Sequence, residues 1–151
     1  MATISSRSDQ NVAQLNSYLR GELSAVATYD IALHKLQLGD AMRPPLESCQ
    51  RSHARRADRL RETIRAFGGT PSESAGAWGV FAKLVEKGAA VLGEKMAISA
   101  LEEGEDHGLH DYKDDIDKLA AETKQLVVTE LLPEQERTHR VLSDIKHELE
   151  H

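Results

Sequence analysis

Four segments of the chain repeat apolar residues at spacings of three and four, and glycine- or proline-containing breaks separate them. This spacing places apolar side chains on one face of an α-helix. The segments cover roughly residues 8–38, 44–68, 94–121 and 122–148. The one β-like run, residues 126–129, falls inside the helical period of the last segment. The sequence therefore predicts an all-α protein built as a four-helix bundle.

The breaks between these segments predict how the helices connect. Gly39 and Asp40 end the first helix, and a proline pair at 44–45 suits the first turn of the second. Only a short link joins helices one and two, and another joins helices three and four, so each pair forms an antiparallel hairpin. A long crossover over residues 68–93 joins the hairpins and carries a short extra helix near residues 78–92. Pro133 either kinks the fourth helix or marks a boundary in it.

Composition limits the classes of protein to which this chain can belong. Its 151 residues suit one domain, which we assign to residues 1–148. Residues 149–151 match the start of a common histidine tag, unless they simply finish the last helix. A net charge of −6 argues against nucleic acid or an anionic membrane as partner. With a polar N-terminus, no membrane-spanning run and a single cysteine, Cys49, we expect a cytoplasmic protein without an intrachain disulfide.

Each of the four apolar stripes contains at least one side chain that is costly to bury alone. In the fourth stripe a glutamate and a histidine stand three residues apart, and a shared metal ion would satisfy both. Taken singly, these residues are better explained as exposed glutamates or as core histidines with protein partners. Their occurrence in all four helices favours a metal site, in which either Glu102 or Glu105 is the ligand from the third helix. The candidate ligands are Glu22, Gln50, His53, Glu102, Glu105, Glu136 and His139.

This ligand order resembles the ferritin-like superfamily, which includes rubrerythrin and bacterioferritin. Two helices of that di-iron pattern each give a glutamate, and the other two each give a Glu-x-x-His pair. The chain is most similar to an uncharacterised bacterial ferritin-like family, known as a domain of unknown function. The similar stretches are residues 67–71 (FGGTP), 100–112 (ALEEGEDHGLHDY) and 133–145 (PEQERTHRVLSDI). The chain departs from the pattern at Gln50, where a glutamate is expected, so the site would be incomplete.

The resemblance implies a function, and a rival to it. A metal-loaded site would hold one or two ions of iron or manganese and would oxidise Fe(II) or handle oxygen or peroxide during stress. It would need an external electron donor, because the chain has no Cys-x-x-Cys motif. The alternative is a metal-free structural or stress-response bundle that acts through protein–protein contacts.

Charges of opposite sign gather on two of the predicted helices. Such runs are usually solvated faces, but here they could pair between helices or across a homodimer, which is the assembly we expect. The second helix carries Arg51, Arg55, Arg56, Arg59, Arg61 and Arg65, and the third carries Asp106, Asp111, Asp114, Asp115 and Asp117.

Overall fold

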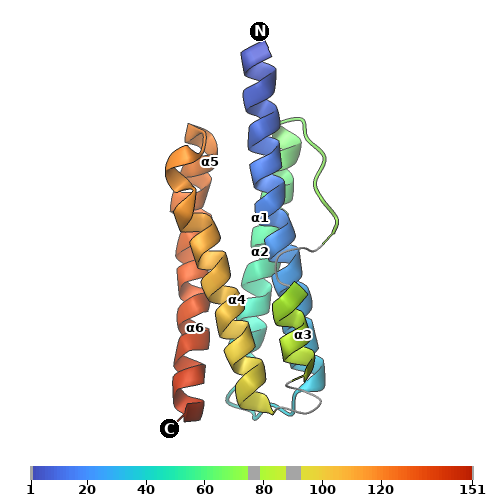
Figure 1. The fold of residues 1–151 in the computed structure, drawn as a ribbon, viewed down its shortest axis with the longest axis vertical. Helices are drawn as coiled ribbons and strands as arrows, with labels where there is room; N and C mark the ends of the chain where they lie inside the picture. The colour runs from blue at the N-terminus through green and yellow to red at the C-terminus, as the bar shows by residue number, and fades with distance from the viewer. Residues whose placement is uncertain (1, 75–78, 88–92, 151) are drawn as a thin grey trace.

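The computed structural model describes residues 2–74, 79–87 and 93–150, and these residues form helices and turns with no strand. The long helices are α1 (Ala2–Lys35), α2 (Arg43–Ala66), α4 (Glu94–Asp114) and α6 (Leu132–Glu150) (Figure 1). Shorter elements are α3 (Gly79–Lys87), the 3₁₀ turn η2 (Ile116–Lys118), α5 (Ala121–Leu126) and the π-helical turn η3 (Val127–Leu131). The predicted all-α class is confirmed. No helix of the described ranges is both long and apolar enough to span a membrane.

Proline and glycine set the ends of α2 and the start of α4. Pro44 and Pro45 occupy the first turn of α2, where a missing N–H leaves no hydrogen bond unmade. Gly68 follows α2 with φ of 80°, and Gly93 precedes α4 with φ of 97°, values that L side chains rarely adopt. The first helix begins earlier than predicted, at Ala2, and ends three residues sooner, at Lys35.

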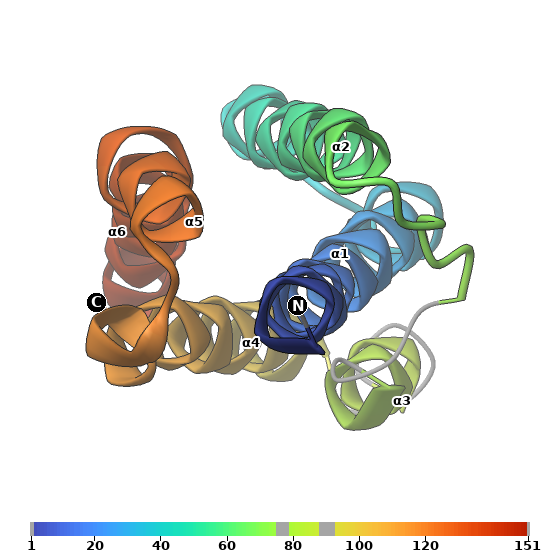
Figure 2. The same ribbon diagram turned by 90° about the horizontal axis from the view of Figure 1, so that it is seen from above.

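The helices pack as two antiparallel hairpins. One hairpin is α1 with α2, and the other is α4 with the α5–α6 arm (Figure 1). Seen from above, these four arms surround a common centre, and α3 lies outside them against α1 and α4 (Figure 2). The long connection from α2 to α4 carries α3, as predicted, although residues 75–78 and 88–92 of that stretch lie outside the described residues.

The fourth helix is not continuous α-helix. The π-helical turn η3 lies directly before the first residues of α6, where Pro133 has no N–H to offer the carbonyl of residue 129. A π turn holds more residues than an α turn and so changes which side chains face inward. Val128 is accordingly 45% exposed, whereas Val127 and Leu131 are buried.

The core consists of two apolar clusters, one on each side of a layer of buried polar residues. One cluster centres on Tyr29, Leu46 and Leu101, and the other on Leu19, Leu60 and Leu131. Along every long helix, the polar residues of the layer fall between members of the two clusters. The bundle thus places charged and hydrogen-bonding groups at mid-height of its interior.

Candidate functional site

The polar layer draws side chains from all four long helices. α1 contributes Glu22, α2 contributes His53 and Arg56, and α4 contributes Glu105, each at most 4% exposed. α6 contributes Gln135 and Thr138, both fully buried. Buried charges are stable only when they are paired and hydrogen-bonded, so the contacts within this layer decide what it can do.

Both carboxylate oxygens of Glu105 are fully occupied by protein donors. Oε2 accepts hydrogen bonds from the Tyr29 hydroxyl at 2.5 Å and from His53 Nε2 at 2.7 Å. Oε1 accepts from the Thr138 hydroxyl at 2.7 Å and from Gln135 Nε2 at 2.9 Å. Burial opposes ionisation, but His53, Arg56 and these donors outweigh it and lower the pKa of Glu105 to about 2. Four donors match the four acceptor sites of a carboxylate, and Glu105 is therefore saturated.

His53 lies between the two carboxylates of the layer. Its Nε2 faces Glu105, and its Nδ1 lies 3.1 Å from Glu22 Oε1. Two carboxylate partners favour a ring that is protonated on both nitrogens. Burial and the nearby Arg56 oppose that charge, yet Glu105 and Glu22 outweigh them and raise the pKa of His53. As an imidazolium, His53 has no nitrogen lone pair left for a metal ion.

Arg56 supplies the second cation of the layer. Its Nε lies 3.2 Å from Glu22 Oε2, Nη1 donates to Gln135 Oε1, and Nη2 donates to the Thr138 hydroxyl at 3.1 Å. Burial opposes its charge, but Glu22 and, to a smaller extent, Tyr112, Glu105 and Tyr29 together outweigh burial and raise the pKa of Arg56. When His53 is protonated, two cations face two carboxylates and the layer carries no net charge. We call Glu22, His53, Arg56 and Glu105 the charge quartet.

The predicted inward orientation of Glu136 and His139 is wrong. Glu136 is exposed. The side chain of His139 is 23% exposed, and its Nε2 lies 3.2 Å from Glu102 Oε1, at the rim between α4 and α6. The inward pair of α6, again three residues apart, is Gln135 and Thr138.

Of the seven predicted ligands, the structure brings three together: Glu22, His53 and Glu105. Gln50 is half-buried, and its amide donates to the carbonyl oxygen of Val26 at 3.1 Å instead of turning to the quartet. Glu102 is a rim residue, which makes Glu105 the inward glutamate of the third predicted helix.

Sequence reasoning missed Arg56, Gln135 and Thr138. Arg56 was grouped with the solvated arginines of its helix, although it falls one turn after His53 on the buried face. Helical spacing counted from the core residue Leu142 towards the N-terminus would have identified Gln135 and Thr138. The buried series 142, 138, 135, 131 and 127 keeps steps of three and four. Gly108 supports this register, because a Cβ there would lie 2.8 Å from Gln135 Nε2.

The donor set does not fit a di-metal centre. The di-iron pattern requires four carboxylates and two neutral imidazoles. Gln50 and Gln135 stand where two of those carboxylates would be, and Thr138 stands where one imidazole would be. The three remaining groups already bind Arg56 or one another. Within the described ranges, no three His, Cys, Asp or Glu side chains are arranged to share a metal ion.

Cys49 belongs to the apolar cluster around Tyr29 and is fully buried. Burial and the charge of Glu105 raise the pKa of its thiol to about 12, so it stays protonated at neutral pH. The predicted role of a small buried apolar residue fits this environment.

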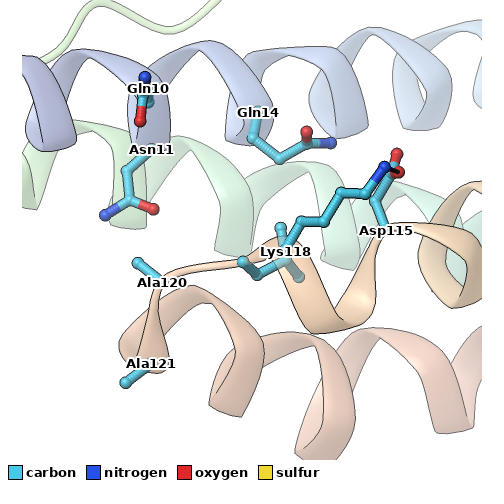
Figure 3. A pocket seen from close by; sticks show the side chains of 8 residues that line it. Gln10, Asn11, Gln14, Asp115, Lys118, Ala120 and Ala121 are labelled. Carbon is cyan, nitrogen blue, oxygen red and sulfur yellow. Dashed lines mark ion pairs between the residues drawn. The ribbon is translucent and has the colours of Figure 1, made fainter.

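A separate pocket lies at one end of the bundle, between the start of α1 and the turn from α4 to α5. Its volume is about 550 Å³. Figure 3 shows the side chains of Gln10, Asn11 and Gln14 on one stretch of α1, beside a turn that includes Asp115 and Lys118. It shares no residue with the charge quartet. We therefore treat the quartet as the candidate site.

Comparisons with known proteins agree with this architecture. The structure resembles a solved structure described as ferritin like, diiron-carboxylate proteins from Bacillus anthracis str. Ames, with a TM-score of 0.66 and 18% identity. The match covers 95% of each chain, and at this identity it shows the ferritin-like fold alone. No curated protein matches the chain. A model of the domain of unknown function DUF2383 matches residues 10–118, well over half of the chain. The chain belongs to the family of the domain of unknown function DUF2383.

Proposed function

We propose that this protein is a metal-independent ferritin-like bundle that acts through protein–protein contacts, as a structural or stress-response protein. In this proposal Arg56 and the His53 imidazolium take the place of metal cations against Glu22 and Glu105. The saturation of Glu105 by four protein donors is the observation that carries it.

The energetics of the quartet support this proposal. A metal ion on Glu105 would have to displace at least one donor and leave that donor unpaired in the core. A second ion beside Glu22 would meet the guanidinium of Arg56, 3.2 Å from Oε2. Each buried charge or donor left without a partner costs on the order of 1–5 kcal/mol. The protein's own cations therefore hold the layer together without metal.

Aerobic loading with Fe(II) tests the proposal. After desalting, bound iron per chain is measured by mass spectrometry, and Fe(II) oxidation is followed by absorbance. We expect no stoichiometric iron and oxidation no faster than in a protein-free control. Uptake of one or two ions per chain that is lost in Glu105→Gln would refute the proposal.

A matched variant shows whether the assay can detect a site in this bundle. It restores both Glu-x-x-His pairs and removes the competing cation with four changes: Gln50→Glu, Gln135→Glu, Thr138→His and Arg56→Ser. We expect this variant to bind two Fe(II) or Mn(II) ions and to melt at a higher temperature when metal is present, by binding linkage. A reduced variant without Arg56→Ser should bind less metal, because the guanidinium remains.

A second candidate function is iron oxidation or the handling of oxygen or peroxide. The solved structure described as diiron-carboxylate favours it. For this chain it requires His53 to lose a proton and to turn from a carboxylate partner to iron. Iron or manganese, at one or two ions per chain, is the cofactor of this candidate, with an external electron donor. Iron uptake by the unaltered chain in the loading experiment decides between the two.

A further inference from the structure

A small pocket lies between α1 and α4, beside the charge quartet. Ser17, Tyr18 and Glu22 of α1 and Gly108, Asp111 and Tyr112 of α4 line it. The volume open to the centre of a water-sized sphere in this pocket is about 10 Å³. This is about the smallest volume that holds one water molecule, and far too little for an organic ligand.

Three buried oxygen atoms of the pocket residues make no hydrogen bond of normal geometry with the described residues: Tyr112 Oη, Glu22 Oε2 and Tyr18 Oη, the last of which the Gln14 side chain also approaches. The three residues are only 5%, 2% and 4% exposed, respectively. Arg56 approaches Glu22 Oε2 as an ion pair, but its Nε–H donates to the Ser52 carbonyl. Buried oxygens of this kind nearly always have a partner, because leaving one without costs free energy comparable to a lost hydrogen bond.

The charges around the pocket indicate what kind of partner fits. The carboxylate of Glu22 disfavours an anion. Arg56, within 3.2 Å of Glu22 Oε2, disfavours a metal cation. A neutral molecule that both donates and accepts satisfies a carboxylate and two hydroxyls together. Glu22 is also the strongest of the charges that, after burial itself, raise the pKa of Tyr112, which places the phenol near this carboxylate.

We propose that this pocket is a binding site for one water molecule, which donates to Glu22 Oε2 and bridges it to the tyrosine hydroxyls. The two carboxylates of the quartet then differ. Protein groups donate all the hydrogen bonds that Glu105 accepts. Glu22 instead accepts one hydrogen bond from the water molecule, which exchanges with solvent past the exposed Ser17. The inference rests on the pocket and on the unpaired oxygens, and it holds whether or not the protein acts without metal.

The sign of one stability change tests the inference. If water bridges Tyr112 to Glu22, Tyr112→Phe removes a satisfied hydroxyl and strands the water. The unfolding equilibrium constant should then rise about fivefold in urea titrations, as for a typical lost hydrogen bond. If the hydroxyl has no partner, its removal eliminates the desolvation cost of an unpaired buried group. The unfolding equilibrium constant should then fall or stay unchanged, and this result would overturn the inference. Ser17→Ala is the control at the exposed edge of the pocket and should change nothing.

A crystal structure of the unaltered protein at high resolution gives an independent readout. We expect one density peak within hydrogen-bond distance of Glu22 Oε2 and of at least one of the two tyrosine hydroxyls. The peak should weaken or vanish in Tyr112→Phe. A pocket without density, or a direct bond between Tyr112 and Glu22, overturns the inference even if the stability change has the expected sign.

Discussion

Arg56 provides the sharpest test of how the polar layer is held together. The change Arg56→Met keeps an unbranched side chain of similar length and removes the guanidinium. Glu22 Oε2 then loses its ion pair, and the Gln135 and Thr138 side chains each lose a donor. Every one of these groups is buried, so bulk water cannot replace the lost contacts without opening the bundle.

The magnitude follows from the cost of leaving a buried charge without its partner, about 3–5 kcal/mol. For a chain of this length, each kcal/mol lowers the melting temperature by about 2–4 °C. We therefore expect Arg56→Met to lower it by roughly 10 °C. Glu22→Gln should also destabilise the protein, because it leaves Arg56 as an uncompensated cation. The double variant should lose at least about 2 kcal/mol less than the sum of the two single losses, because no charge is then left unpaired between them.

Urea unfolding followed by circular dichroism measures all four corners of this cycle. Arg55→Met is the matched control: its side chain is 66% exposed, and it lies 3.8 Å from Glu134. It should change stability by no more than about 0.5 kcal/mol. The reasoning fails if Arg56→Met costs less than about 1 kcal/mol, or if the losses from Arg56→Met and Glu22→Gln simply add.

Three further predictions concern pH, register and assembly. The lowered pKa of Glu105 contributes stability above its ordinary value of 4.5 that is lost as pH falls towards 2. The raised pKa of His53 contributes stability that is complete below pH 6.5 and is lost as the pH rises through the raised value. The melting temperature should therefore be highest between pH 4.5 and 6.5, and Glu105→Gln should reduce its fall at acid pH. Thr138→Val should cost about 1–3 kcal/mol and His139→Ala less than about 1 kcal/mol by urea unfolding, and the reverse order would restore the register predicted from sequence. Light scattering should give the mass of a homodimer at high micromolar concentration, and a strict monomer would contradict the proposed pairing of charged outer faces.

Much of the architecture could be predicted because it depends on local signals. Apolar spacing identified the helices, and glycine and proline located the breaks near residues 39–45 and 68–71. The long crossover between the second and third helices predicted two separate helical hairpins, and the structure contains both. Glu22, His53 and Glu105 were also identified correctly as inward residues, because each falls in a regular stretch of helix without a local irregularity nearby.

The fourth helix was phased wrongly, because two stripes with steps of three and four both lead to Leu142. The apolar pair Val128 and Leu132 suggested a stripe that continues to Glu136 and His139. The π turn before Pro133 instead directs Val127 and Leu131 inward, and with them Gln135. A π turn has no simple sequence signature, whereas a proline inside a helix warns that one continuous period is unsafe.

The chemistry of burial offers a criterion where periodicity fails. Two registers were available for α6, one burying Glu136 and His139 and the other burying Gln135 and Thr138. Without metal, the first would place a third carboxylate beside Glu22 and Glu105, with Arg56 and two histidines to balance it. The second adds only neutral donors and acceptors, which match the guanidinium and the saturated carboxylate. Because taking each additional ion out of water costs several kcal/mol, a metal-independent core favours the second register, which adds no further ion. The register of α6 and the proposed metal-independent function are therefore linked, because both depend on Arg56 as the cation that faces Glu22.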